Sequence, residues 1–113
     1  MAWSLNAGTV TKLSVKATPG NVFALRVTNV NAAARWFQLH NKASAPAAGE
    51  TAQLYFPIPA GSATVPGVLE VSGSFLFGGE PFTTGVGWAI STTADTFTDS
   101  ATANEHTTVL RYG

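Results

Sequence analysis

Residues 22–29 read VFALRVTN, and residues 34–41 read ARWFQLHN. Apolar and polar side chains alternate along both stretches, so the pattern predicts two half-buried β-strands. The polar segment between them supplies a connection rich in Asn and Ala. The side chains predicted to face the core are Phe23, Leu25 and Val27 in the first strand and Phe37 and Leu39 in the second.

Strands of the same kind are predicted on both sides of this pair. Each run is rich in β-branched and aromatic residues, and clusters of Gly, Pro, Asn and Ser separate the runs. Seven or eight such strands, with almost no helical periodicity, predict an all-β fold: an antiparallel β-sandwich of the jelly-roll or immunoglobulin-like type. The further runs are residues 9–17, 52–58, 64–72, 74–77, 84–91 and 105–112, with 64–72 and 74–77 open to being one strand bent at Gly73.

Two of these runs contain residues that restrict their surroundings. Pro57 and Pro59 have no N–H to donate, so the strand over 52–58 is predicted at a sheet edge or at a strand exit. In the run 84–91, small residues alternate with large ones. This small-residue side predicts close approach of a large side chain or of another backbone.

The composition is poor in charge. Of 113 residues, 45% are hydrophobic and only 11% are charged, and six basic residues balance six acidic ones. Soluble domains average about 25% charged residues. A neutral chain lacks the basic excess that nucleic-acid binding needs, and near-zero net charge favours association. We therefore expect a part of a larger assembly, with no nucleic acid as partner.

The length indicates one domain. We expect a single sandwich over residues 9–113, preceded by an N-terminal arm or cap over residues 1–8 that contains Trp3 and Leu5. The chain has no cysteine, which excludes disulfides and thiolate metal sites. No apolar run approaches the ~20 residues of a membrane span, and the first residues lack a signal-peptide pattern. The expectation is a protein made in the cytoplasm, with no membrane partner.

Catalytic and metal-binding patterns are weak. His40 and His106 are the only imidazoles, there is no cysteine nucleophile, and no serine lies in a Gly-x-Ser-x-Gly motif. Asp95 and Asp99 lack the spacing of a calcium loop, although Glu105 and His106 follow shortly after. We therefore expect no enzyme activity, no metal and no cofactor, with the two aspartates acting as turn residues.

Outward-facing aromatic residues are the strongest sign of a binding surface. Trp36 and Tyr55 are predicted on the side of their strands opposite the core residues. Three interpretations stay open: the facing of the strands is reversed or a second sheet covers these residues, they join a subunit interface, or they form a sugar-binding platform with Gln38 or Asn41. The candidate interface residues are Trp3, Leu5, Trp36 and Tyr55.

The stretch FALRVTNVNAAARWFQLHNKASAP at residues 23–46 resembles a pattern in small structural proteins of tailed bacteriophages. In that pattern, a strand ending in VTN leads through a small-residue turn into a segment of the type ARxxxLxNKAxxP. Residues 54–61 and 84–91 fit the same pattern, so the resemblance covers roughly residues 20–112. It implies a β-sandwich or jelly-roll module of a virion, in a family whose modules are often trimeric. The resemblance identifies no functional residues.

The resemblance therefore implies a non-enzymatic virion structural protein, made in the host cytoplasm. The expected roles are capsid decoration or cement, or a head fibre. Its expected partners are further copies of the chain, with a trimer favoured, and the major capsid protein or other virion proteins. The alternative is a tail-fibre or baseplate-associated protein, or a carbohydrate-binding module that attaches to a host glycan.

Overall fold

The computed structural model describes residues 2–72, 79–100 and 104–113, which form nine β-strands and no helix. In this described part of the chain there is accordingly no helix that could cross a membrane. The strands are β1 (Ala2–Asn6), β2 (Lys12–Lys16), β3 (Gly20–Asn29), β4 (Arg35–Asn41), β5 (Leu54–Ile58), β6 (Gly67–Val71), β7 (Glu80–Phe82), β8 (Val86–Ser91) and β9 (His106–Tyr112).

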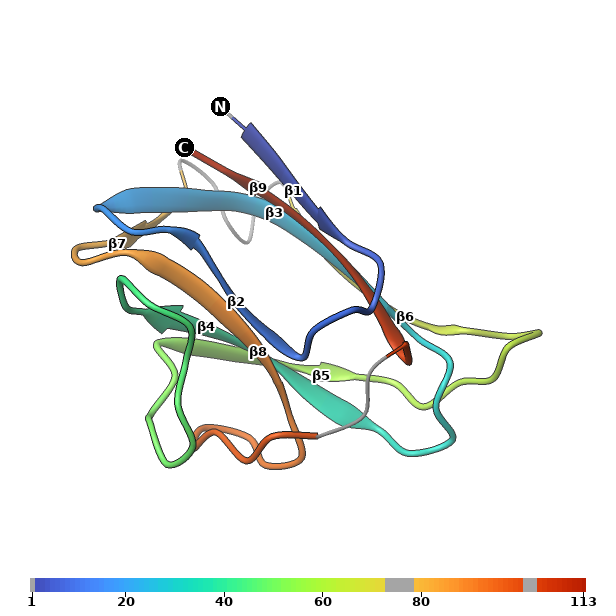
Figure 1. The fold of residues 1–113 in the computed structure, drawn as a ribbon. Coiled ribbons are helices and arrows are strands. Elements are labelled where there is room, and N and C mark those ends of the chain that lie inside the picture. Colours follow the sequence, from blue (N-terminus) through green and yellow to red (C-terminus); the bar gives the residue numbers. More distant parts are fainter. Residues whose placement is uncertain (1, 73–78, 101–103) are drawn as a thin grey trace.

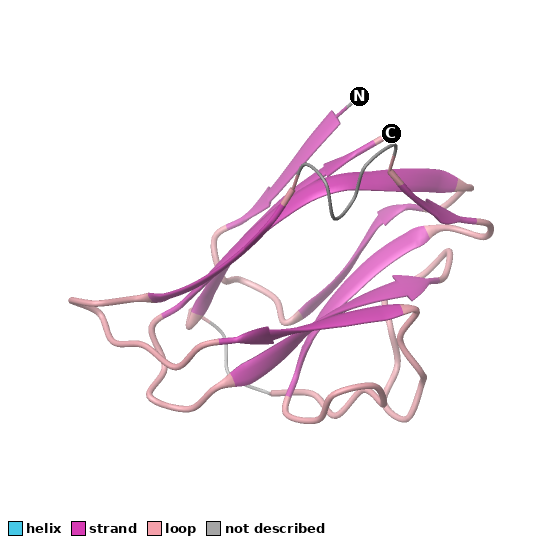
Figure 2. Cartoon of the chain, turned by 180° about the vertical axis from the view of Figure 1, so that it is seen from behind, coloured by secondary structure: helices cyan, strands magenta, loops and turns pink. Residues whose placement is uncertain are grey.

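The strands form two antiparallel sheets that pack face to face (Figures 1 and 2). One sheet has the order β1-β9-β3-β6, with β7 also paired to β3, and the other has the order β2-β8-β4-β5. The pairing is nested: β1 pairs with β9, β2 with β8, β3 with β6, and β4 with β5. An antiparallel chain folded back on itself in this way and wrapped into two sheets is a jelly roll. The predicted all-β sandwich is confirmed.

The core fills the space between the two sheets. Phe37 and Trp88 stack at its centre, with ring centroids 5.9 Å apart. Strand β8 is buried along its whole length, as a central strand with a covered outer side should be. The buried hydrophobic cluster consists of Val22, Leu25, Val27, Phe37, Leu39, Phe56, Ile58, Val71, Phe82, Val86, Trp88, Ile90 and Leu110.

A register shift in β3 changes one predicted core position. Leu25 and Val27 face the core as predicted, but Val22 is buried in place of Phe23, which is only half-buried. The pairing of β3 with β9 shifts between Val22 and Ala24. Such an irregularity inserts an extra residue on one strand and reverses the side to which the preceding residues point. The prediction for Phe23 was therefore wrong.

Two predictions drawn from Pro and Gly are confirmed. Strand β5, which contains Pro57, lies at the edge of the four-stranded sheet. A Cβ atom placed on Gly85 would lie 2.6 Å from the Lys42 carbonyl oxygen, and one on Gly87 would lie 3.4 Å from Pro46 Cδ. The backbone and side chains of the loop after β4 thus approach the small-residue side of β8, as its composition indicated.

Two short strands lie where the sequence did not indicate them. Residues 2–6 belong to the segment expected to be an arm or a cap, and they form β1, paired with β9 over five residues. Residues 80–82 fall partly in the Gly-rich segment expected to be a loop, and they form β7 against the start of β3. The strand predicted over 74–77 and the bend at Gly73 lie outside the described residues.

Candidate interaction surface

The five-stranded sheet turns one broad side away from the core. Side chains alternate across the sheet, so residues that oppose the outward-pointing Leu5 in register also point outward. Leu5 opposes Val109, Val109 opposes Arg26, and Arg26 opposes Glu70. We call this side the five-stranded outer face; its members are Trp3, Leu5, Ala24, Arg26, Thr28, Val68, Glu70, Thr107, Val109 and Arg111.

Large apolar side chains on this face are open to solvent. Trp3 is 62% exposed and Leu5 70%, both on the edge strand β1, and Val68 on β6 is 42% exposed. A solvent-exposed tryptophan beside further apolar side chains is typical of contact surfaces, in which Trp is enriched. The exposed apolar residues therefore mark the five-stranded outer face as the candidate surface.

A hollow of about 380 Å³ crosses the same face from β1 to β6. Its lining combines an aromatic ring, aliphatic carbon and charged groups of both signs, which is the mixture found in binding pockets. The lining residues are Trp3, Ala24, Leu25, Arg26, Glu70, Ser72 and Val109.

The charged groups of the hollow are not paired with each other. Arg26 and Glu70 oppose each other in register, yet the ion pairs within the described residues join Lys12 to Asp99 and Lys42 to Glu50. Arg111 lies over the Trp3 ring, with its guanidinium carbon 5.6 Å from the ring centroid. This cation–π contact holds the edge tryptophan against the sheet. Within the described residues, neither Arg26 nor Glu70 takes part in an ion pair.

The chain's own loops cover part of the outer side of the four-stranded sheet. The Gln38 side-chain amide donates hydrogen bonds to the carbonyl oxygens of Thr93 (3.2 Å) and Ala94 (2.7 Å). His40 meets the ring of Phe97 edge-on, with centroids 6.1 Å apart. The outward residues Gln38 and His40 of this sheet are thus covered by the loop after β8.

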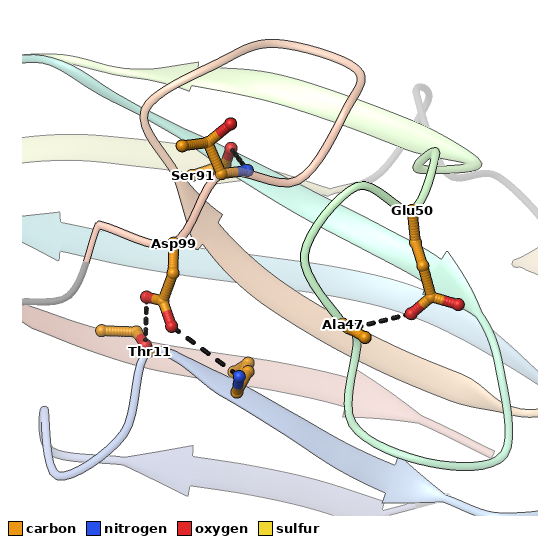
Figure 3. Close-up of polar contacts among 7 residues, drawn as sticks. Thr11, Ala47, Glu50, Ser91 and Asp99 are labelled. Atoms are coloured by element: carbon orange, nitrogen blue, oxygen red, sulfur yellow. Dashed lines mark hydrogen bonds and ion pairs between the residues drawn. The ribbon is translucent and has the colours of Figure 1, made fainter.

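Hydrogen bonds and ion pairs fix these covering loops (Figure 3). The Asp99 carboxylate accepts a hydrogen bond from the Thr11 hydroxyl at 2.7 Å and lies 3.8 Å from the Lys12 ammonium. Ser91 Oγ accepts hydrogen bonds from the backbone N–H groups of residues 93 and 98. Glu50 accepts a hydrogen bond from the Ala47 N–H at 2.5 Å. These contacts attach residues 47–50 and 91–99 to the sandwich.

Trp36 and Tyr55 lie on the outer side of the four-stranded sheet. Trp36 on β4 opposes Pro57 on β5, and Tyr55 on β5 opposes Gln38 on β4. The rings of Trp36 and Tyr55 meet edge-on, with centroids 5.7 Å apart and planes at 73°. Trp36 is half-buried, whereas Tyr55 is 47% exposed. The edge-on arrangement does not offer one flat stacking platform. The structure therefore separates the four predicted interface residues into two pairs, one on each sheet.

The polar residues proposed to assist a sugar platform are already engaged. Gln38 is buried beneath the loop after β8. The Asn41 amide donates to the Thr83 hydroxyl at 2.9 Å and accepts from the Thr84 N–H at 2.8 Å. The side-chain amides of both residues therefore form hydrogen bonds within the chain and do not extend the surface of Trp36 and Tyr55.

Both histidines are buried, at 2% exposure for His40 and 6% for His106. Burial lowers the pKa of His40 below its ordinary value of 6.5, with Glu50 opposing the shift and Lys42 reinforcing it. Burial likewise lowers the pKa of His106, with Glu105 opposing and Arg35 reinforcing. His40 Nε2 lies 2.9 Å from Gln38 Oε1. These rings are structural parts of the sandwich.

Two of the residues considered for a metal site, Asp99 and Glu105, are engaged within the chain. Asp99 binds Thr11 and Lys12, and the Asn31 amide donates to the Glu105 carboxylate. Within residues 2–72, 79–100 and 104–113, no three side chains of His, Cys, Asp or Glu form a group that could hold a metal ion.

Comparison of the chain with protein-family models, with curated proteins and with solved structures finds no match. The candidate surface is therefore defined by its geometry and chemistry. Sequence reasoning indicated Trp3 and Leu5 but missed the hollow beside them. The outward position of Arg26 in the alternating pattern was the available signal, and the neighbouring Glu70 and Val109 depend on a strand order that one sequence does not give.

Proposed function

We propose that this chain is a non-enzymatic structural protein of a tailed-phage virion that works by burying its five-stranded outer face against neighbouring subunits. The favoured roles are capsid decoration or a head fibre, in the form of a homo-oligomer for which the sequence resemblance favours a trimer. The observation that carries the proposal is the exposure of Trp3 and Leu5 at one edge of this face and of Val68 at the other, with the charged residues Arg26 and Glu70 between them.

The chemistry of this face fits contact with a protein. Contact surfaces combine exposed aromatic anchors with a polar rim, and a few anchors carry most of the binding energy. Trp3 has the position of such an anchor, while Arg26 and Glu70 supply charges that a neighbour can match. Repetition in a particle would multiply weak contacts through avidity.

The fold gives further support by analogy. Jelly rolls are common in viral capsid proteins and in lectins. Because one fold serves many functions, this likeness raises the expectation of a virion role without identifying the site. The resemblance of residues 20–112 to phage structural proteins points in the same direction.

The proposal is tested on particles of the phage that would encode the chain. Quantitative mass spectrometry of purified particles measures the copy number: a high number indicates decoration, a low number indicates fibres or a baseplate, and absence contradicts the proposal. Stripped particles are then re-bound by Trp3→Ser protein, with Tyr55→Ser as the matched control on the other sheet. We expect Trp3→Ser to weaken binding by about 30-fold, as loss of an anchor does.

Carbohydrate binding is the second candidate, favoured by the hollow beside Trp3. A sugar ring could stack on the indole while Arg26, Glu70 and Ser72 bond its hydroxyl groups. A glycan array tests this directly. Hits that Trp3→Ser abolishes and Tyr55→Ser preserves support it, and an array without hits contradicts it.

A further inference from the structure

The two sheets have exposed edges, and most of these edges are protected against pairing with other strands. Edge strands present unpaired N–H and C=O groups, and proteins guard them with lysines, prolines, other charges and bulges. Strand β2 carries Lys12 and Lys16 and a register shift between Ser14 and Lys16. Strand β5 contains Pro57.

The strands at the far side of the five-stranded sheet are protected as well. Strand β6 follows Pro66 and carries Glu70. Strand β7 has only three residues, and two of them are Glu80 and Pro81. Each of these strands therefore has at least one of the devices that prevent pairing at an edge.

Strand β1 has none of these devices. Its sequence, AWSLN over Ala2–Asn6, contains no charge and no proline, and its register with β9 runs without a shift over all five residues. Among the described residues, no backbone group of β1 bonds to another backbone segment outside its own ladder. In an antiparallel pair, alternate residues point their N–H and C=O groups away from the neighbour. Within the described residues, this edge is therefore unpaired and its ladder with β9 is regular.

We infer that β1 pairs with β1 of a second copy of this chain, antiparallel and about a two-fold axis at Ser4, so that the two five-stranded sheets become continuous. The outer faces of the two copies lie on the same side of the joined sheet only if one residue of β1 lies opposite the same residue of the second copy. Only a register centred on Ser4 pairs all five residues of both strands. Because β1 carries no charge, the two copies meet there without like-charge repulsion.

The same register joins the exposed apolar side chains. Trp3 of one copy lies opposite Leu5 of the second copy, and the symmetric pair repeats the contact, so four apolar side chains form one row across the seam. Aromatic and aliphatic cross-strand pairs stabilise a sheet. Trp3 and Leu5, which are 62% and 70% exposed in the single chain, contact each other across the seam in this arrangement.

The size of the contact predicts its strength. Five residues per copy give about four to six backbone hydrogen bonds, whereas a standard interface uses about 20–30 residues a side. The dimer should therefore be weak, with a dissociation constant on the order of 100 μM. Such a contact becomes effective where copies are held close together.

A single cysteine tests the register, because the chain contains none. In the proposed dimer the two Cα atoms at position 4 lie about 4.5 to 5.5 Å apart, within the range that a disulfide spans. We expect Ser4→Cys protein, incubated with an oxidised glutathione buffer, to form covalent dimers at least tenfold faster than Val65→Cys protein. Val65 is 73% exposed in the loop before β6, so it reports random collision.

A charge variant tests the same contact at equilibrium. Leu5→Lys should weaken dimerisation by at least tenfold in sedimentation experiments up to about 1 mM protein, while Val65→Lys should leave it unchanged. Circular dichroism and unfolding curves check that the variants remain folded. Equal crosslinking of the two cysteine variants, or wild-type protein that stays monomeric throughout the series, would overturn the inference.

The edge contact and the proposed virion role can fail separately. Ser4 is not a member of the five-stranded outer face, so its crosslinking reports the edge alone. Val68→Lys alters the outer face on β6, away from β1, and should leave the Ser4→Cys crosslink intact. Crosslinking in a protein absent from virions would retain the edge contact and reject the virion role.

Discussion

The two buried histidines should make the stability of the sandwich depend on pH. Burial lowers the pKa of both His40 and His106 in the folded protein, while the unfolded chain titrates near 6.5. Below that pH the unfolded chain binds more protons than the folded protein, so stability rises with pH. The contribution of the two neutral histidines to the free energy of unfolding is complete above about pH 6.5. It is lost as the pH falls below the pKa of the unfolded chain toward the lower pKa of the folded protein.

The magnitude follows from the number of histidines. Below about pH 6.5, one fully buried histidine lowers the free energy of unfolding by up to about 1.4 kcal/mol for each unit of falling pH. Two such histidines lower it by up to about 2.7 kcal/mol. The hydrogen bonds of Gln38 indicate which nitrogen of the neutral His40 ring carries the proton. The Gln38 amide nitrogen donates to two loop carbonyls, so its oxygen faces the imidazole and accepts the Nε2–H of the neutral ring.

Urea unfolding, followed by tryptophan fluorescence at pH 7.5 and at pH 5.5, measures the effect. We expect the wild-type protein to lose up to about 2.7 kcal/mol over this interval. His40→Gln and His106→Gln should each remove about half of the pH dependence. A wild-type free energy of unfolding that is equal at the two pH values would refute the reasoning, as would a double variant that keeps the full slope.

Three further predictions concern single contacts. Gln38→Leu should cost about 1 to 3 kcal/mol, because two loop carbonyls lose their donor, and urea unfolding checks it. Gly67→Ala should lower the stability by about 1 to 3 kcal/mol, since its Cβ would lie 2.1 Å from the Pro59 oxygen; thermal unfolding measures the loss. Lys12→Ala removes an exposed ion pair with Asp99 and should change stability by less than about 1 kcal/mol, again by urea unfolding.

The alternation of apolar and polar side chains in the sequence predicted most of the strands and the side of each that faces the core. Leu25, Val27, Phe37 and Leu39 reach the core as their spacing predicted, and Pro57 lies on an edge strand. Phe23 does not, because a register shift in β3 has no sequence mark comparable to a proline. Local pattern therefore predicts the facing of regular strands and fails where one strand gains a residue over its neighbour.

The candidate surface was predictable only in part. Trp3 and Leu5 could be noticed as apolar residues without a partner, but their neighbours across the sheet follow from nested pairing between distant segments. Gln38 and His40 show the opposite difficulty: they alternate like exposed residues, yet a loop more than fifty residues away covers Gln38. Long-range packing decides which polar residues are exposed, and a single sequence contains little information about it.

The nested pairing also has a consequence for how the chain reaches its native state. Strand β9 lies between β1 and β3, so the five-stranded sheet lacks its central member until the last residues take part. Ala2 opposes Tyr112, and closing a loop of that length is entropically costly before any contact rewards it. Folding should accordingly be slow, on the order of milliseconds to seconds, as for other chains dominated by distant contacts. Until β9 docks, both sides of β1 are unpaired, and the growing chain is at its most vulnerable to aggregation.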